Sequence, residues 1–351
     1  MASQKKPLSR RQFLGLMTVS AGATALAACA APPEPTATAP APTAVPPNPT
    51  APPLPPTAEP APTVAAPTRQ LAVRFAHISD MHIEPKGIAV QHFSRAMRNV
   101  QMLTPPVEFV VNAGDCVMDA MFTNKDWANQ QWDGFQSVLS KDFPLPVYHA
   151  IGNHDVWGWG LRAEEQDKVK DDPLFGKGLA MEKLGLTNRY YTFEQGGWRF
   201  IVLDSVHLAD QVFQHPYTGK LDDEQYEWLV HQLNGTPAET PICIVSHIPV
   251  FGSSGLMDSD ESSGNWVMPG AWQHIDGRKL IDLFWEHRNV KLCLSGHTHQ
   301  VEDLKYHGVN YLTNGAISGN WWKGAYHDFP PGYVVFNLYT DGSVENEFIE
   351  Y

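Results

Sequence analysis

The sequence predicts a mixed α/β fold in which two sheets pack together as a sandwich and helices flank them, an α-β-β-α arrangement. Three observations support this prediction. Short apolar runs alternate with amphipathic stretches of helical length from residue 70 to about residue 295, and the chain beyond is mostly strand-like. Five of the apolar runs also end in Asp, Asn or His, which places polar side chains at the strand ends where open α/β sheets usually bind ligands.

The first 29 residues are predicted to be a targeting segment. Ser9–Leu14 carries two adjacent arginines and resembles the twin-arginine export signal of bacteria. The apolar stretch that follows is too short and too rich in small residues for a membrane span, and it ends in Leu26–Cys29, which resembles the lipobox of bacterial lipoproteins. This resemblance implies export across the cytoplasmic membrane and lipid anchoring in the cell envelope through Cys29. A plain signal peptide with an incidental cysteine is the alternative.

Residues 30–69 are predicted to be a disordered tether, because they are nearly all Ala, Pro and Thr and contain no aromatic residue. Residues 70–351 are predicted to form the globular domain, and we find no internal repeat in them. The tether would hold this domain away from a membrane surface.

Within the domain, the elements follow from apolar periodicity and from turn residues. Gly196-Gly197 between two apolar runs predicts a hairpin, and the Gly/Ser-rich residues 252–270 predict a long loop. A short helix is expected within residues 161–185. The other predicted helices are 88–103, 126–140, 222–233 and 277–287, and the predicted strands are 71–79, 107–113, 147–151, 190–193, 198–203, 242–246, 291–295, 309–312 and 333–338.

Polar residues close five of these strands in a way that core packing does not explain. Asp is almost never buried without a partner, so its repeated placement after a buried strand predicts a cationic partner, and a metal centre is the simplest one. The endings are Asp80-Met81-His82, Gly114-Asp115, Gly152-Asn153-His154-Asp155, His247 and Gly296-His297-Thr298-His299.

Composition limits the partners that the protein can have. The chain is 43% hydrophobic, which suits a globular core, and its net charge is −13. Such a surface repels polyanions, so no nucleic-acid partner is expected, and a small substrate drawn to a local positive centre is favoured. The four cysteines form no Cys-x-x-Cys pair, and the three beyond Cys29 lie in or beside apolar strands as inert buried thiols.

The five endings, in this order over residues 71–300, resemble the calcineurin-like metallophosphoesterase family. The resemblance implies that Asp80, His82 and His299 bind one divalent metal ion, that Asn153, His247 and His297 bind a second, and that Asp115 bridges the two. Mixed carboxylate, amide and imidazole ligands suit Mn, Fe or Zn. Two such ions would activate a bridging hydroxide and hold the phosphoryl oxygens of the substrate.

The same resemblance implies that His154 is the catalytic general acid. Asp155 is predicted to act with it by orienting the imidazole, and a turn-capping role is the alternative. Family members commonly carry an acid three positions after the bridging Asp, but Met118 stands there in this chain and Asp119 follows it. Asp119 is therefore a second candidate partner of His154.

The expected substrate is a small phosphodiester, such as a cyclic nucleotide or a glycerophosphodiester, because no Lys or Arg lies within the five motifs to bind a dianion. Two alternatives stay open: a phosphomonoesterase on the same site, and a metal-binding lipoprotein without turnover. Trp321-Trp322 is expected either to fill the core and its rim or to form a platform for a base, sugar or headgroup. No oligomeric state is predicted.

Overall fold

The computed structural model describes residues 69–209, 215–258, 262 and 264–351. The predicted targeting segment with Cys29, and the predicted tether up to residue 68, lie outside the described residues. Among the described helices, none is both long and apolar enough to cross a membrane.

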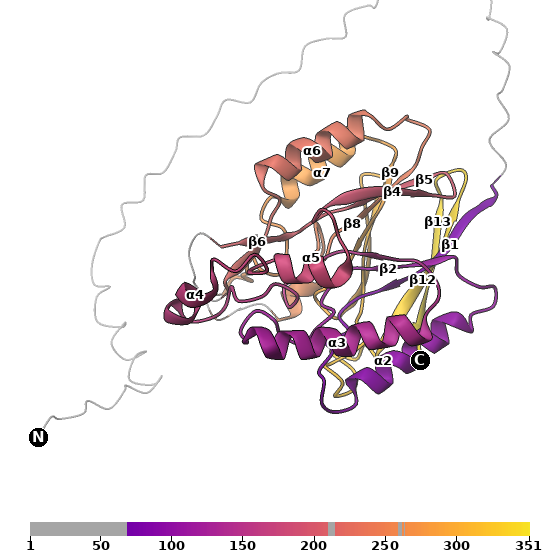
Figure 1. Ribbon diagram of the computed structural model, residues 1–351. Helices are drawn as coiled ribbons and strands as arrows, with labels where there is room; N and C mark the ends of the chain where they lie inside the picture. Colours follow the sequence, from indigo (N-terminus) through magenta and orange to yellow (C-terminus); the bar gives the residue numbers. More distant parts are fainter. Residues whose placement is uncertain (1–68, 210–214, 259–261, 263) are drawn as a thin grey trace, which may run out of the picture. The chain divides into compact units, whose positions relative to one another are not determined.

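The first sheet has the strand order β13-β12-β1-β2-β3 (Figure 1). β1, β2 and β3 run parallel to one another, β12 is antiparallel to β1, and β13 is antiparallel to β12. The three parallel strands therefore end at one edge of the sheet. Their bounds are β1 Leu71–Ile78, β2 Phe109–Asn112 and β3 Val147–His149, followed by β12 Gly332–Tyr339 and β13 Val344–Glu350.

The second sheet has the order β10-β11-β9-β8-β5-β4. β5, β8, β9 and β11 are parallel, and antiparallel β4 and β10 close the two sides. A separate two-stranded ribbon, β6-β7, follows β5. The bounds are β4 Tyr191–Gln195, β5 Trp198–Val202, β6 Val206–Leu208, β7 Tyr217–Gly219, β8 Ile242–Val245, β9 Val290–Ser295, β10 Val301–Tyr306 and β11 Val309–Asn314.

Helices cover the outer face of each sheet. α2 (Ala89–Gln101) and α3 (Lys125–Asp142) lie along the first sheet, where Phe93 and Trp132 share one buried cluster with β-strand residues such as Val110 (Figure 1). α6 (Asp223–Asn234) and α7 (Gly277–Glu286) pack on the second sheet through Leu229, Phe284 and neighbouring apolar residues. The layers thus run α-β-β-α, and the predicted fold is confirmed.

Aromatic side chains fill the space between the sheets. Phe75 of β1 stacks on Phe109 and Phe336 of its neighbouring strands, with ring centroids 5.1 and 5.2 Å apart, and meets Phe200 of the other sheet edge-on at 5.5 Å. All four rings are buried. Because Phe75 lies on the strand that ends next to Asp80, this packing fixes the position of the strand end.

The structure corrects four details of the prediction. Residues 161–185 contain two short helices, α4 (Ala163–Val169) and α5 (Gly178–Leu184), and a 3₁₀ turn, η1 (Ser254–Asp258), interrupts the predicted long loop. The β6-β7 ribbon was not predicted, because three-residue strands show no readable periodicity. β3 is shorter than the predicted strand and half-buried, since it is the edge strand of its sheet.

Candidate metal centre

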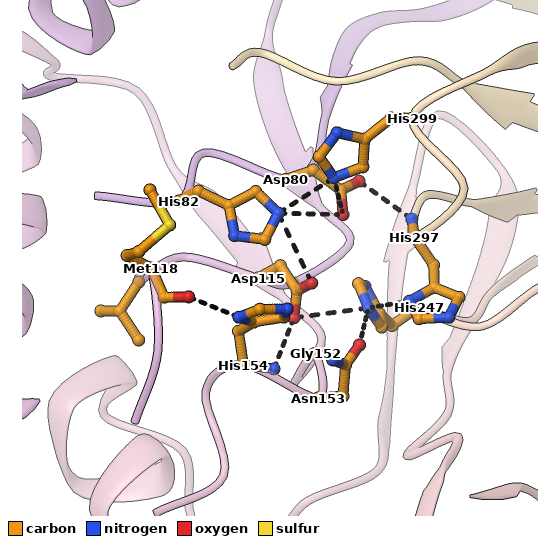
Figure 2. Close-up of polar contacts among 12 residues, drawn as sticks. Asp80, His82, Asp115, Met118, Gly152, Asn153, His154, His247, His297 and His299 are labelled. Carbon is orange, nitrogen blue, oxygen red and sulfur yellow. Dashed lines mark hydrogen bonds and ion pairs between the residues drawn. The ribbon is translucent and has the colours of Figure 1, made fainter. Parts of the chain in front are cut away.

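The five polar endings meet where the parallel strands of both sheets end (Figure 2). β1, β2 and β3 deliver their endings from the first sheet, and β8 and β9 deliver theirs from the second. The structure brings together all seven predicted ligands: Asp80, His82, Asp115, Asn153, His247, His297 and His299.

One group of side chains consists of Asp80, His82 and His299, all buried. The Nε2 atoms of the two histidines face each other at 3.0 Å. Asp80 Oδ1 lies 3.5 Å from His299 Nε2 and 3.9 Å from His82 Nε2, and it accepts no hydrogen bond. A buried carboxylate oxygen that points between two imidazole nitrogens is the geometry of a cation site.

A second group surrounds His247. Its Nε2 lies 3.0 Å from Asn153 Oδ1 and 3.2 Å from His297 Nδ1. Asp115 lies between the two groups, with Oδ1 3.4 Å from His247 Nε2 and Oδ2 3.7 Å from His82 Nε2. One carboxylate therefore reaches both groups, as a bridging ligand must.

Backbone carbonyls fix which nitrogen of His247, His297 and His299 faces the centre. His247 Nδ1 donates to Ala113 O at 2.8 Å, and His299 Nδ1 donates to Gly319 O at 2.6 Å. His297 uses its other nitrogen, and Nε2 donates to Ala271 O at 3.0 Å. The other nitrogen of each of these three rings then directs a lone pair toward the other ligands. Lone pairs that face one another repel unless a cation or a proton lies between them. The residues thus fit two divalent metal ions.

Electrostatics prepares these groups for a metal. Burial alone would raise the pKa of Asp80 and of Asp115, but neighbouring histidines, His299 and His247 respectively, lower both values. Burial opposes protonation of His247, but the nearby charge of Asp115 outweighs it and raises the pKa of His247 to about 9. For His297 burial dominates and lowers the pKa to about 3. The site therefore holds charged carboxylates, and a metal ion has to displace the proton on His247.

The backbone is strained at the predicted ligands. Asp80, His82, Asp115, His297 and His299 all have φ between 43° and 72°, the left-handed region that residues with a Cβ seldom adopt. Such strain costs of order 1–3 kcal/mol per residue and concentrates at functional sites. Here it turns each side chain out of its strand direction and toward the centre.

His154 lies beside this cluster, and one of its ring nitrogens forms a third candidate group with His82 and Asp115. Its ring packs edge-on against His82 at 4.7 Å, and its backbone N–H donates to Asp115 Oδ1 at 2.8 Å. Its Nδ1 makes a short hydrogen bond to the carbonyl oxygen of Met118. The Asp119 carboxylate instead accepts from Phe122 N at 2.9 Å. The main chain at Met118 therefore orients the imidazole, and Asp119, the second candidate partner, bonds to Phe122 N instead.

Asp155 points away from His154 and into the loop that carries Asp115. Oδ2 accepts from the backbone N–H groups of Asp115 and Gly152 at 2.9 Å each, and Oδ1 accepts from Cys116 at 2.8 Å. Burial, followed by the nearby charge of Asp115, raises the pKa of Asp155 to about 7. These contacts agree with the turn-capping alternative, since Asp155 ties two ligand loops together. Its predicted catalytic role stays a prediction.

Gly152 is required by the close approach of these two loops. A Cβ at this position would meet the Oδ1 and backbone nitrogen of Asp115, and would lie 2.8 Å from its Cγ. The carboxylate that links the two groups leaves no room for any side chain here.

We expect Gly152→Ala to lower activity by roughly 10²-fold, the cost of misplacing catalytic groups by about 1 Å. Bound metal, measured by elemental analysis of the same sample, should fall in parallel, because Asp115 must move. Gly235→Ala at the end of α6 is the matched control, since its Cβ would come no nearer than 3.2 Å to another atom, the carbonyl oxygen of His231. An unchanged metal content in Gly152→Ala would contradict this role of the glycine.

The metal centre opens into a cavity of about 470 Å³. Trp321, one of the two adjacent tryptophans, lies on its wall, with its ring centroid 4.4 Å from that of His299. Trp322 instead packs against the buried core and donates Nε1–H to His82 O at 3.0 Å. Trp321 is therefore placed to serve as a platform, whereas Trp322 fills the rim of the core. Further lining residues are Asp119, Met121, Phe122, His215, Tyr217, Gly255, Trp272, Thr298 and Tyr326.

A chain of hydrogen-bonded side chains supports the segment that contacts His297, and it was not predicted. Ser246 Oγ lies 3.1 Å from His274 Nε2, and His274 Nδ1 lies 2.8 Å from Asp276 Oδ1. Ser246 is fully buried and donates to Ile248 O at 2.7 Å, so this set is not a nucleophilic triad. It anchors the segment that carries the Ala271 carbonyl, the hydrogen-bond acceptor of His297.

Comparison with known proteins agrees with this site. A family model described as calcineurin-like phosphoesterase matches residues 73–301, which contain all seven predicted ligands and His154. The chain is 24% identical to a 3′,5′-cyclic-nucleotide phosphodiesterase of Nostoc over 285 residues, or 78% of this chain and 91% of that protein. It is 22% identical to the 3′,5′-cyclic adenosine monophosphate phosphodiesterase CpdA of Escherichia coli K12 over 289 residues, covering 78% and 88% of the two chains.

A solved structure, a dimetal phosphatase from Danio rerio, superposes with a TM-score of 0.56 at 16% identity. The superposition covers 80% of this chain and all of that one. At this identity the likeness establishes a common fold and no more.

Proposed function

Because the chain belongs to the calcineurin-like phosphoesterase family, whose members are metal-dependent phosphoric ester hydrolases, we propose that it hydrolyses a phosphodiester of a nucleotide. A cyclic nucleotide is the first candidate, by analogy with the Nostoc and E. coli relatives.

The lining of the cavity supports this proposal. Among the described residues that line it there are four Trp and Tyr side chains, Tyr217, Trp272, Trp321 and Tyr326, and no Lys or Arg. A phosphodiester carries a single negative charge, whereas a phosphomonoester at neutral pH approaches two. A cavity without a cationic side chain therefore favours the diester, and its aromatic walls suit the faces of a base or sugar.

The residues of the chain have separable tasks in such a reaction. A bound metal pair supplies Lewis acidity and lowers the pKa of a water molecule. Asp115 links the two ligand groups and sets the spacing between them. Because the Met118 carbonyl accepts from His154 Nδ1, Nε2 is the nitrogen through which a proton can pass to the leaving oxygen.

The test compares bis-p-nitrophenyl phosphate, p-nitrophenyl phosphate and cyclic AMP on the purified protein, with metal content determined on the same sample. We expect near two metal ions per chain and a kcat/KM for the diester roughly tenfold or more above that for the monoester, which corresponds to about 1.4 kcal/mol. Faster monoester cleavage would indicate a phosphatase. Bound metal without any hydrolysis would favour the non-catalytic alternative.

We propose further that the protein is exported by the twin-arginine route and anchored in the cell envelope by acylation of Cys29. The support is the order of arginine pair, apolar stretch and lipobox in residues 9–29. Cys29→Ala is expected to move the protein from the membrane fraction to the soluble fraction without changing its activity. A Cys29→Ala protein that stays with the membranes would contradict lipid anchoring.

A further inference from the structure

A second cavity lies beside the one at the metal centre, and the two share Trp321 as a wall. Its volume is about 320 Å³. It is formed by the segment that leads into α2, by the loop that contains Trp321, and by Met118, whose carbonyl oxygen holds His154. Its lining residues are Glu84, Lys86, Gly87, Ile88, Ala89, Met118, Trp321, Trp322 and Lys323.

The charges of the two cavities differ. Lys86 and Lys323 line the second cavity with a single carboxylate, Glu84, so its charged side chains sum to +1. The Lys86 ammonium lies 5.4 Å from the ring centroid of Trp127. The positive end of the α2 dipole adds to this field, because the first turn of α2 has no acidic residue. The second cavity thus has a net positive lining in a chain of net charge −13.

The shared wall is held rigidly. Trp321 and Trp322 adopt φ values of 46° and 66°, so two consecutive residues are in the left-handed region. The loop is fastened to the metal ligands on both sides, since Gly319 O accepts from His299 Nδ1 and Trp322 Nε1 donates to His82 O. Trp321 therefore lines both cavities from one fixed position, with the predicted ligands in one cavity and the two lysines in the other.

We propose that the second cavity is a subsite for a second anionic group of the substrate. The substrate would then be a nucleotide phosphodiester that also carries a phosphate, with its base or sugar against Trp321, the scissile diester at the metal centre and the additional phosphate near Lys86 and Lys323. This inference rests on the proposed function, and it names the substrate class of the same active site. Among the described residues, no Lys or Arg lines the main cavity to bind that second charge, whereas Lys86 and Lys323 line the neighbouring one.

The test uses two chromogenic diesters with the same scissile bond, the 5′-(p-nitrophenyl phosphate) of thymidine and its 3′-phosphorylated derivative. In the wild-type protein we expect the 3′-phosphate to lower KM roughly tenfold, with little change in kcat. Lys86→Met combined with Lys323→Met should abolish this difference and leave kcat/KM for bis-p-nitrophenyl phosphate within about twofold of wild type. The control is Lys168→Met combined with Lys279→Met, which changes the net charge equally at exposed sites outside both cavities.

Binding provides a second readout that needs no turnover. Calorimetry should give tighter binding of thymidine 3′,5′-bisphosphate than of thymidine 5′-monophosphate, and the advantage should disappear in the Lys86→Met/Lys323→Met protein. If no diester is hydrolysed but this lysine-dependent advantage persists, the proposed function fails while the subsite stands. Equal binding of the two nucleotides by the wild-type protein would overturn the subsite. So would lysine-dependent binding of inorganic phosphate without any advantage for the bisphosphate, which would indicate a site for a free anion.

Discussion

Asp115→Asn is expected to lower phosphodiester hydrolysis by roughly 10³-fold or more, the upper range for loss of one preorganised electrostatic group. The two oxygens of Asp115 lie 3.4 Å from His247 Nε2 and 3.7 Å from His82 Nε2, so this carboxylate faces a histidine of each ligand group. An amide is neutral, and its nitrogen cannot bind a cation. Metal content should fall below two ions per chain, as measured by elemental analysis after gel filtration.

The fold should survive this substitution, because asparagine retains the oxygen that accepts from the backbone N–H of His154. Asp303→Asn on exposed β10 is the matched control, since it removes the same charge away from the centre. Thermal unfolding of both variants, freed of metal, should resemble that of the metal-free wild type. Full activity of Asp115→Asn with two metal ions bound would refute the bridging assignment and would require another residue to link the ions.

The sequence allowed the ligand positions to be predicted because of a geometric rule. Parallel strands of one sheet end at the same edge, so the polar endings after β1, β2 and β3 had to lie close together, and the same holds for β8 and β9. Periodicity cannot say that the two sheets bring these edges face to face. That step came from the resemblance of the five endings to a known family.

The interactions that orient the imidazoles could not be predicted in the same way. Their acceptors are the carbonyl oxygens of Ala113, Met118, Ala271 and Gly319. Every residue has a carbonyl group, so no residue type marks these positions in a sequence. A carboxylate can be recognised in a sequence, so Asp119 was a candidate partner of His154. The oxygen that accepts from His154 is instead the backbone carbonyl of Met118. The left-handed backbone conformation of Asp80 and His82 could not be predicted either, because glycine is the residue usually expected at a positive φ.

His154→Ala is expected to lower kcat for cyclic AMP by roughly 10²–10⁴-fold, the usual contribution of a positioned proton donor. The same variant should cleave bis-p-nitrophenyl phosphate with a much smaller loss, because nitrophenolate leaves as a stable anion and an alkoxide does not. Steady-state kinetics on the two substrates gives both values. The backbone N–H that donates to Asp115 Oδ1 is retained in the variant, so the bridging carboxylate should keep its position.

Metal content decides between the two roles that the geometry allows His154. A ring nitrogen of His154 lies within 4.8 Å of ligand atoms of His82 and Asp115, so these three residues could also hold an ion. A proton donor can be removed without loss of metal, whereas removal of a ligand weakens binding and slows both substrates alike. His231→Ala in the exposed last turn of α6 controls for loss of an imidazole elsewhere. An equal loss of activity on both substrates, together with a lower metal content, would show that His154 is a metal ligand. A loss of activity on cyclic AMP alone, with two metal ions retained, would show that His154 is the general acid.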